Sequence, residues 1–419
     1  MDIENFKVLT LNCWGVFTPI VCENRHERLS AISEKLSEGF YDIILLQEIW
    51  TESDFEKIKK KLENMYQYSN YFHSNLIGSG CCIFTKYKIV NTFFYRFSLN
   101  GYPHSLHHGD WFGGKGIGLV TLETSLKKFT INVYVTHMHA RYMHKEEDDQ
   151  YSFHRISQGY EMGNFIRLTS GCCDAIIVGG DFNMDNSMIG FNLLTSSSGI
   201  KDAWVCANDP SKYPLEVSAT CDRPDGLYSN KKWLQYYPNG ERLDYIFFKQ
   251  NSCIKLECKR CTLDMRSVPG CNRMDYSDHC GVAAQFEISQ NPLEIADVID
   301  EEKRANACSM AFGKLDFEIK RIKKHFKLEC TVFILALFCI IMDYPNNLIK
   351  SMLWESGIPV IIDRFILFVL SIVCFVSFWY FAVLRSNEKK AILNVKQSLK
   401  IILNNSNTNI KNLCGDKNY

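Results

Sequence analysis

Residues 175–183, with the sequence Ala-Ile-Ile-Val-Gly-Gly-Asp-Phe-Asn, form the stretch around which the rest of this chain is organised. Its first four residues are apolar and favour a buried strand. The two glycines predict a sharp turn at the end of that strand, since glycine adopts conformations that other residues avoid. Asp181 and Asn183 would project from this strand end and could hold a water molecule or a phosphate oxygen beside a metal ion. An Asx-rich turn without any chemistry explains the stretch equally well when it is taken alone.

Four other apolar stretches end in polar side chains that suit the same chemistry. Taken singly, each has an ordinary explanation: Glu48 as an edge carboxylate, His137 or His139 as a core histidine, and Asp278 with His279 as a cap. Together they place acids, amides and histidines at successive strand ends, which makes chance a poor explanation. In chain order the candidates are Asn12, Glu48, His137, His139, Asp181, Asn183, Asp244, Asp278 and His279.

The pattern between residues 6 and 287 predicts many strands with few helices between them. Helices are expected at 25–36, from residue 52 after a capping-box sequence, and at 154–168. Strands are expected at 6–12, 42–47, 80–84, 90–97, 116–122, 129–136, 175–178, 243–249, 254–263 and 281–288. This order favours an α/β (α+β) fold: a four-layer sandwich of two mixed sheets flanked by helices, rather than one doubly wound sheet.

Composition narrows the class of protein. The chain has 419 residues, 46% of them hydrophobic, which is enough for at least one large core. Lys+Arg and Asp+Glu are both 47, so the net charge of zero argues against a general nucleic-acid binder. The 18 cysteines are scattered and form no paired CxxC motifs, so free thiols in a reducing compartment are expected rather than zinc or disulfides. The acidic N-terminus has no apolar region typical of a signal peptide.

The last third of the chain has a different pattern. Residues 289–303 are polar and acidic, and residues 312–327 form a basic amphipathic stretch. The apolar run at 330–342 is marginal for a membrane span unless it extends to Tyr344, whereas the run at 365–384 has the length that a bilayer demands. A transmembrane hairpin is the preferred hypothesis, with one span plus a re-entrant segment as the alternative. Basic residues before the first run and after the second predict that both ends are cytosolic.

The strand-end residues resemble those of the deoxyribonuclease-like superfamily of metal-dependent phosphodiesterases. The resemblance implies that Glu48 ligates a catalytic Mg²⁺, with Asn12 nearby and Asp278 beside the metal. It implies that Asp181 and Asn183 hold the attacking water and the phosphate.

The same resemblance assigns the proton-transfer roles. His279 would be the general base, Asp244 its orienting partner, and His137 would steady the phosphate or the leaving oxygen. Mg²⁺ suits carboxylate oxygens and neutralises phosphoryl charge, and a histidine near neutral pH can take a proton from water.

Within this superfamily the chain is most similar to the membrane-bound neutral sphingomyelinases, over nearly its whole length. The motifs that carry the similarity are at residues 11–15, 78–84, 99–103, 107–112 and 136–140, together with the paired apolar segments. The resemblance implies four regions: a deoxyribonuclease-like catalytic domain at 1–290, a linker and basic stretch at 291–327, two membrane segments at 328–385, and a polar cytosolic tail at 386–419. Asn-Met follows Phe182 where Leu is common, and the first span is short.

The glycine-rich sequence at 109–115 copies most of a phosphate-loop signature. Gly116 stands where that signature requires Ser or Thr, and no strand–loop–helix unit is expected around it. Three interpretations remain: a nucleotide site, a flexible substrate-side loop that brings Lys115 near the phosphate, and a plain glycine-rich turn.

The resemblance therefore predicts an Mg²⁺-dependent phosphodiesterase that hydrolyses sphingomyelin to ceramide and phosphocholine at the cytosolic face of a membrane. The expected location is the endoplasmic reticulum or the plasma membrane, with no nucleic-acid partner. A phospholipase C-type activity on lyso-choline lipids would use the same residues, so the sequence does not separate the two substrates. A catalytically inactive membrane adaptor is the alternative from another class, and the intact candidates Glu48, Asp181, Asn183 and His279 argue against it. A 5-phosphatase is disfavoured because residues 220–223 match its signature only in part.

Overall fold

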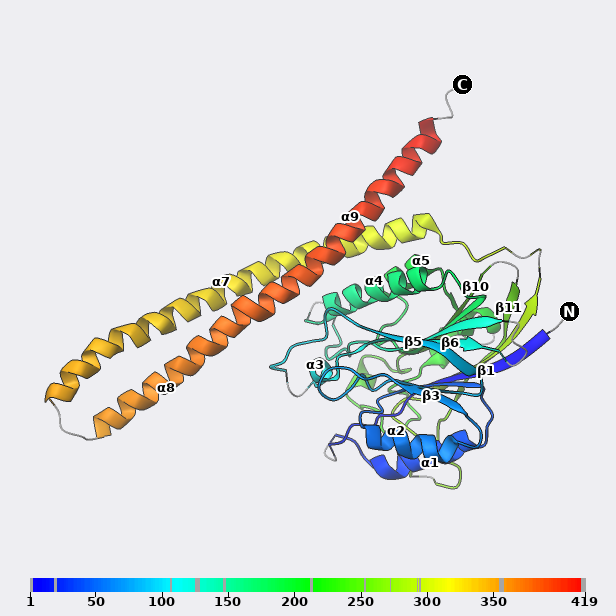
Figure 1. Cartoon of the computed structure of the whole chain (residues 1–419), viewed down its shortest axis with the longest axis horizontal. Coiled ribbons are helices and arrows are strands. Elements are labelled where there is room, and N and C mark those ends of the chain that lie inside the picture. Colours follow the sequence, from blue (N-terminus) through cyan, green and yellow to red (C-terminus); the bar gives the residue numbers. More distant parts are fainter. Residues whose placement is uncertain are drawn as a thin grey trace. The chain divides into compact units, whose positions relative to one another are not determined.

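The computed structural model describes residues 3–18, 21–105, 108–124, 129–145, 148–211, 214–251, 254–271, 273–291, 293, 295–353 and 358–415. The chain divides into two compact units, Met1–Ala307 and Cys308–Tyr419. Figure 1 shows that the first unit contains the sheets and that the second consists of long helices. Each unit is considered by itself.

The first unit is built on two six-stranded mixed sheets, whose order of neighbours is β11-β12-β1-β2-β4-β3 in one and β5-β6-β7-β8-β10-β9 in the other. The strands of the first sheet are β1 (Ile3–Asn12), β2 (Ile43–Gln47), β3 (Tyr68–Tyr71), β4 (Cys82–Thr85), β11 (Ile254–Asp264) and β12 (Gly281–Gln290). Those of the second are β5 (Lys88–Arg96), β6 (Gly116–Glu123), β7 (Thr130–His137), β8 (Ala175–Asp181), β9 (Lys201–Asp202) and β10 (Asp244–Gln250). In each sheet one central pair is parallel, β1 with β2 and β7 with β8.

Helices cover the outer face of each sheet, which makes four layers. Figure 1 shows α1 (Arg25–Ser37) and α2 (Glu52–Leu62) on one side of the unit and α4 (Ser152–Thr169) and α5 (Ile189–Ser198) on the other. The connections contain the short helices α3 (Asp110–Gly113), α6 (Ala203–Ala207), η1 (Leu215–Ser218) and η2 (Trp233–Gln235). The fold class expected from the sequence is therefore confirmed.

Alternation along the central strands explains why the layers stack. In β1, Val8 faces the core between the sheets, whereas Leu9 faces the core under α1 and α2. In β8, Ile177 faces the core between the sheets and Val178 faces the core under α4 and α5. A strand with apolar residues on both faces is buried on both sides, so both sheets are internal layers.

The expected sharp turn at the glycines after Val178 is wrong. Gly179 and Gly180 both lie inside β8, which ends only at Asp181. The physical reason for glycine here is the close approach of the parallel neighbour: a Cβ on Gly180 would lie 2.0 Å from the carbonyl oxygen of Thr136 on β7. The expected strands are otherwise confirmed to within a few residues, whereas β3, β9 and the helices α3, α5 and α6 were not expected.

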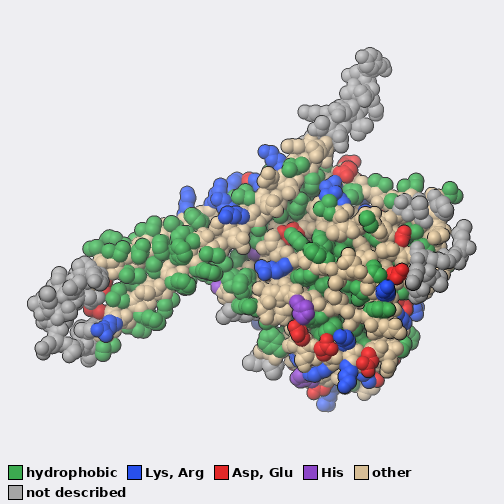
Figure 2. Space-filling view, in the orientation of Figure 1, with side chains coloured by type: hydrophobic (Ala, Val, Ile, Leu, Met, Phe, Trp, Pro, Cys, Tyr) green, Lys and Arg blue, Asp and Glu red, His purple; other side chains and the backbone are tan. Residues whose placement is uncertain are grey.

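The second unit consists of α7 (Glu301–Leu353, which begins in the first unit), α8 (Ile358–Phe378), the π-helical turn η3 (Trp379–Leu384) and α9 (Arg385–Gly415). The helices pair: the Phe333 ring on α7 contacts Phe381, with 5.4 Å between ring centroids, and Arg385 Nε lies 3.1 Å from Glu329 Oε1. The segments 301–343 and 361–406 each contain a window long and apolar enough to cross a membrane. Hydrophobic side chains gather over part of α7 and α8 in Figure 2, and Lys and Arg side chains lie along another part of α7. The tail expected after residue 385 is helical through Gly415.

Candidate active site

Strand pairing gathers the candidate residues at one end of the sandwich. In the first sheet, Asn12 is the register partner of Gln47, so Glu48 follows beside it. In the second sheet, Asp181 on β8 has His137 on β7 as its partner on one side and Asp244 on β10 on the other. Residues that are far apart in the sequence thus form a continuous row.

Asn12 joins the two halves of this row. Its Nδ2 donates to Glu48 Oε1 and to Asp181 Oδ2, both at 3.0 Å. Its Oδ1 accepts the backbone N–H of Trp14 at 3.0 Å, which fixes the orientation of the carboxamide. Because Asn12 is buried, one neutral side chain holds two carboxylates from different sheets in a fixed arrangement.

The backbone is strained where the sheets meet. Trp14, Glu48 and Asn183 have positive φ values of 46°, 60° and 50°, a region that non-glycine residues rarely adopt. Beside them, a Cβ on Gly15 would lie 2.1 Å from the carbonyl oxygen of Glu48, so only glycine fits there. Trp50 supports the Glu48 side chain, since its Nε1 donates to Glu48 Oε2 at 3.4 Å. The surrounding packing therefore imposes the direction of the Glu48 carboxylate.

Asp244 and His279 form a buried pair. His279 Nδ1 lies 2.7 Å from Asp244 Oδ2, and the backbone N–H of Asp244 donates to Thr220 Oγ1 at 3.1 Å. Burial lowers the pKa of His279, but Cys221 and the Asp244 carboxylate outweigh burial and raise that pKa well above its usual value. With Nδ1 held by Asp244, the other ring nitrogen is the one left to exchange a proton.

The carboxylates of this row fit a divalent cation. Burial, followed by the charge of Asp244, raises the pKa of Asp181 to about 7. Ligand atoms of Asp181, Asp244 and His279 all lie within 4.8 Å of one another, and Asp244 Oδ1 has no hydrogen-bond partner among the described residues. A buried acidic set of this kind is stabilised by a cation, and oxygen donors suit a hard one.

The expected cation ligands were Glu48, Asn12 and Asp278, which is a different set from the tight group around Asp181. The Glu48 side chain is 15% exposed and keeps an oxygen directed to the site. Asp278 accepts from Ser277 Oγ at 3.1 Å, and its pKa is raised by burial, with Glu48 adding to the effect. The ligand assignment to Glu48, Asn12 and Asp278 stays a prediction.

His137 lies beside the ammonium group of Lys115. Its Nε2 is 2.9 Å from Lys115 Nζ and 3.4 Å from Asp181 Oδ2. Burial and the Lys115 ammonium lower the pKa of His137 well below its usual value. Lys115 also contacts Asp110 Oδ1 at 2.5 Å and the carbonyl oxygen of Met138 at 2.9 Å.

Two interpretations of the glycine-rich loop are therefore corrected. The Lys115 side chain is only 3% exposed, directly before β6 and in contact with His137, so it is not a cation on a flexible substrate-side loop. The segment contains the one-turn helix α3 and leads into a strand, which is not the strand–loop–helix arrangement of a nucleotide site. Its contribution to substrate binding stays a prediction, and any effect would act through His137.

Asn183 is fixed by its own hydrogen bonds. Its backbone N–H donates to Asp181 Oδ1 at 2.9 Å, and its Nδ2 donates to the carbonyl oxygen of Met138 at 3.0 Å. The second bond links β8 to the residue that follows His137, so the carboxamide cannot turn freely. His139, the other histidine of that segment, is buried 3.7 Å from Asp110 Oδ2, and burial lowers its pKa to about 4.

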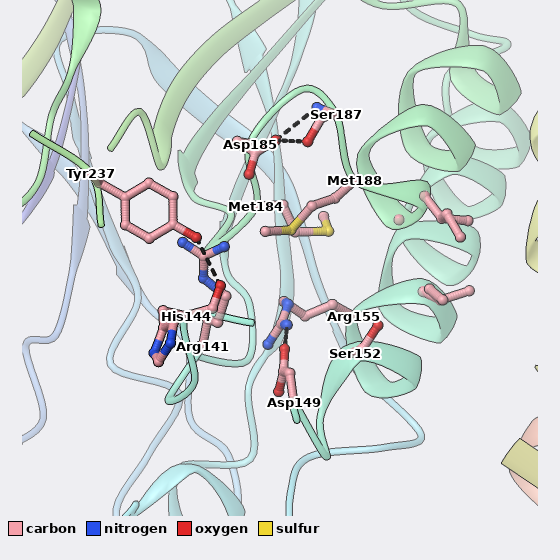
Figure 3. Close-up of a pocket in the computed structure, with 13 residues that line it drawn as sticks. Arg141, His144, Asp149, Ser152, Arg155, Met184, Asp185, Ser187, Met188 and Tyr237 are labelled. Atoms are coloured by element: carbon pink, nitrogen blue, oxygen red, sulfur yellow. Dashed lines mark hydrogen bonds and ion pairs between the residues drawn. The ribbon is translucent and has the colours of Figure 1, made fainter. Parts of the chain in front are cut away.

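A cavity of about 250 Å³ adjoins the site (Figure 3). Met184 and Asp185, which directly follow Asn183, form part of its lining. Arg141 lies over the Tyr237 ring at 4.8 Å and pairs with Glu241. The other lining residues include Arg155, which pairs with Asp149, and His144, Ser152, Ser187 and Met188. The cavity therefore has a mixed lining, in which these polar groups lie beside the apolar side chains of Ile156, Met184 and Ile189.

Sequence reasoning missed one buried residue that organises the site. Arg28 on α1 is fully buried and donates to the carbonyl oxygens of Cys13, Trp14 and Tyr276. It therefore ties the segment after β1 to the segment that carries His279. An arginine on a helix is usually solvated, and nothing in the sequence marks this one as different.

Comparisons with known proteins place the chain among its relatives. The sequence profile of the Endonuclease/Exonuclease/phosphatase family matches residues 9–279. The Caenorhabditis elegans protein described as "Putative neutral sphingomyelinase" is 34% identical over 415 residues, covering 96% of this chain and 92% of that protein. "Sphingomyelin phosphodiesterase 2" of Mus musculus is 34% identical over 289 residues, covering 68% and 66% respectively. "Inositol phosphosphingolipids phospholipase C" of Schizosaccharomyces pombe is 30% identical over 317 residues, covering 71% and 72%.

Proposed function

Because the chain belongs to the endonuclease/exonuclease/phosphatase family, we propose that it is a metal-dependent phosphodiesterase that hydrolyses sphingomyelin to ceramide and phosphocholine. The observation that carries this proposal is the 34% identity to a described neutral sphingomyelinase across 96% of the chain, including both apolar segments. The geometry supports the same chemistry, since an acid–histidine pair and several carboxylates meet at one end of the sandwich.

In this proposal His279 acts as the general base. It accepts one proton from water at the ring nitrogen that Asp244 does not hold, and the water oxygen forms a bond to phosphorus. The bond between phosphorus and the ceramide oxygen breaks, that oxygen takes up a proton from solvent water and leaves as the ceramide hydroxyl, and His279 returns its proton to solvent. Asp244 orients the imidazole and stabilises the imidazolium, and Asp181 with Asn183 positions the water and the phosphate.

Mg²⁺ is the proposed cofactor, because the available donors are carboxylate and amide oxygens, which hard cations prefer. A bound Mg²⁺ would neutralise charge on the phosphoryl oxygens. The residues proposed to hold it are Glu48, Asn12 and Asp278. The raised pKa values of Asp181 and Asp278 are the property of this chain that supports a cation, since burial of so many carboxylates is otherwise costly.

The decisive experiment is an assay of purified full-length protein on headgroup-labelled sphingomyelin. We expect release of labelled phosphocholine with Mg²⁺, loss of release after chelation, and recovery when Mg²⁺ but not Zn²⁺ is added back. His279→Ala protein serves as the control for contaminating hydrolases. Absence of release with every divalent cation tested would support an inactive membrane adaptor instead.

A second substrate class is favoured by one relative and by the cavity. The Schizosaccharomyces pombe relative is described as acting on inositol phosphosphingolipids, and the cavity beside Asn183 offers polar groups that suit a polyhydroxylated headgroup. The bonds broken and the catalytic residues would be the same. Comparing kcat/KM for sphingomyelin, inositol phosphosphingolipid and lyso-phosphatidylcholine in one bilayer composition ranks the headgroups and tests the lyso-lipid alternative.

We also propose that the two apolar segments form a transmembrane hairpin and that both chain ends are cytosolic. The support is two helices of sufficient length and hydropathy, with basic residues before the first and after the second. Protease applied to sealed vesicles should remove tags from both ends. Protection of a C-terminal tag would mean a single span.

A further inference from the structure

Residues 226–237, with the sequence Gly-Leu-Tyr-Ser-Asn-Lys-Lys-Trp-Leu-Gln-Tyr-Tyr, form a segment that the proposed chemistry does not use. It is called the rim segment below. Leu227 and Tyr236 are 51% and 54% exposed, and Lys231 and Lys232 between them are also exposed. The segment therefore exposes apolar, aromatic and basic side chains.

The rim segment is fixed to the loops of both sheets beside the catalytic row. At one end, the Tyr228 ring contacts Trp14, with 5.1 Å between centroids, and Asn24 Nδ2 donates to Tyr228 Oη at 3.3 Å. Trp14 lies two residues after Asn12, in the connection between β1 and α1. This end of the segment is thus held by the first sheet.

The other end is held by the second sheet. The Tyr236 ring stacks on His144 with 3.7 Å between centroids, and Tyr237 Oη donates to the carbonyl oxygen of His144 at 3.0 Å. His144 lies seven residues after His137, in the connection between β7 and α4. The segment consequently crosses the end of the sandwich where the catalytic residues meet.

Hydrogen bonds to residues on either side of the rim segment in the sequence hold it in place. Ser229 Oγ donates to the carbonyl oxygen of Arg223 at 2.6 Å, the backbone N–H of Asn230 donates to Asp222 Oδ1 at 2.6 Å, and Trp233 Nε1 bonds to Glu241. Glu241 lies three residues before Asp244. These bonds fix the segment in place, while the side chains of Leu227, Lys231, Lys232 and Tyr236 remain exposed.

Neighbouring loops add further exposed apolar side chains. Phe17 and Val21 in the β1–α1 connection and Met143 in the β7–α4 connection are each about half exposed. These loops are the ones that hold the two ends of the rim segment. Single exposed apolar residues are normal, but a group of them around an active site marks an interaction surface.

We propose that the rim segment docks on the headgroup layer of a lipid bilayer and thereby presents the sphingolipid phosphodiester to the catalytic residues. Tyrosine and tryptophan favour the membrane–water interface, leucine inserts into its apolar side, and lysines bind lipid phosphates. The mixture fits a bilayer surface better than a protein partner, whose interfaces are depleted in lysine. The same chain carries two helices apolar enough to cross a membrane, and the proposed transmembrane hairpin would tether the rim segment to a bilayer. The substrate part of this inference rests on the proposed function.

The test uses the full chain in nanodiscs of phosphatidylcholine and sphingomyelin with a minor fraction of anionic lipid. The triple variant Leu227→Ser, Lys231→Gln, Lys232→Gln removes one apolar and two basic contacts. Its matched control is the triple variant Phe40→Ser, Lys59→Gln, Lys60→Gln. Phe40 is 58% exposed, but it precedes the first residue of β2, whereas Glu48 follows the last residue of that strand. We expect the rim variant to lose about tenfold in bilayer sphingomyelin hydrolysis, and the control none.

A water-soluble substrate separates docking from chemistry. Hydrolysis of p-nitrophenylphosphocholine in detergent should be the same for wild type, rim variant and control, because the catalytic residues are intact in all three. An equal loss on the soluble and the bilayer substrate would assign the segment to the catalytic structure, and no loss on either would also overturn the proposal.

Hydrogen exchange gives a measurement that does not depend on turnover. Amides of residues 227–236 in the wild type should exchange more slowly in nanodiscs than in detergent, and those around Phe40 should not differ. Identical exchange in the two environments would overturn docking. Slowed exchange in a protein that cleaves no sphingomyelin would instead leave docking in place and refute the proposed function.

Discussion

His137 and His279 are two buried histidines on either side of Asp181, and the charges next to them are opposite. His279 Nδ1 lies 2.7 Å from the Asp244 carboxylate, whereas His137 Nε2 lies 2.9 Å from the Lys115 ammonium. Burial lowers the pKa of both, but the acidic neighbour raises that of His279 above its usual value, and the ammonium lowers that of His137 further. Two side chains of one type therefore have opposite electrostatic environments within one site.

This difference separates the chemical roles available to the two rings. An ammonium group only donates, so Nε2 of His137 must accept, and its neutral ring carries its proton on Nδ1. Such a ring is a poor proton acceptor in turnover. The prediction that His137 steadies the phosphate or the leaving oxygen is therefore restricted to a neutral ring, whereas His279 is equipped to take up and hold a proton.

The largest effect should come from Glu48, whose Oε1 lies 3.9 Å from His137 Nε2. Glu48→Gln keeps the shape of the side chain and removes a negative oxygen ligand, so we expect a loss of activity on the order of 10³-fold, from several kcal/mol of metal-assisted charge stabilisation. Activity measured against Mg²⁺ concentration should also show a weaker apparent affinity. Circular dichroism should be unchanged.

The same variant distinguishes two candidate metal sites, one that contains Glu48 and one formed by Asp181, Asp244 and His279. Near-normal turnover of Glu48→Gln at ordinary Mg²⁺ would exclude the Glu48 side. The tight group of Asp181, Asp244 and His279 would then be the remaining place for the metal.

His279→Ala should give the next largest effect. Loss of a general base lowers kcat by roughly 10²–10⁴-fold, with little change in substrate binding. The acidic limb of the pH–rate profile should disappear, since that limb reports deprotonation of this imidazole. A nearly normal His279→Ala enzyme would remove the proposed mechanism. Steady-state kinetics between pH 5 and pH 9 measure both outcomes.

Asp244→Asn should give a smaller loss and a shifted profile. The carboxylate raises the pKa of His279, so its removal lowers that pKa, and the acidic limb of kcat/KM should move to lower pH. The rate plateau should also fall, because the amide does not hold the correct tautomer. If the two residues act as a unit, the double variant with His279→Ala should be little worse than His279→Ala alone. Fully additive losses would show that they act separately.

Most of the fold and the row of candidates could be predicted from the sequence because both depend on local pattern. Apolar strands of five to ten residues end in a polar side chain at Asn12, Glu48, His137 and Asp181, and parallel pairing then brings such ends together. The edge strands β3 and β9 escaped prediction because they are short and only partly buried, so they lack a clear alternation.

Other hydrogen-bond partners could not be predicted, because they join residues that are distant in the sequence; the Asp244–His279 pair was expected only from the family resemblance. The link from Arg28 to Tyr276 spans 248 positions, and no spacing rule connects them. The structural reason for the glycines of β8 also could not be predicted, because it depends on a residue in another strand. Glycine tolerates turns and close contacts alike, and only the position of Thr136 reveals that a close contact is the reason here.

The smallest effect on activity should come from the cation beside His137. Lys115→Met removes the hydrogen bond to Nε2, which should cost about tenfold in turnover, from roughly 1–1.5 kcal/mol of lost positioning. The variant also leaves the Asp110 carboxylate buried without its ammonium partner, so we expect it to lose about 3–5 kcal/mol of stability. Denaturant unfolding measured beside the activity separates the two losses.

The double variant Asp110→Asn, Lys115→Met is the matched control for charge. In the single variant the remaining Asp110 carboxylate raises the pKa of His137, so turnover should fall at acidic pH, where the ring becomes protonated. In the double variant both charges are absent, so stability should recover in part and the additional loss at acidic pH should be smaller. If the single and double variants share one pH profile with the wild type, the charge beside His137 does not set its protonation, and the contrast between the two histidines comes from the groups beside His279.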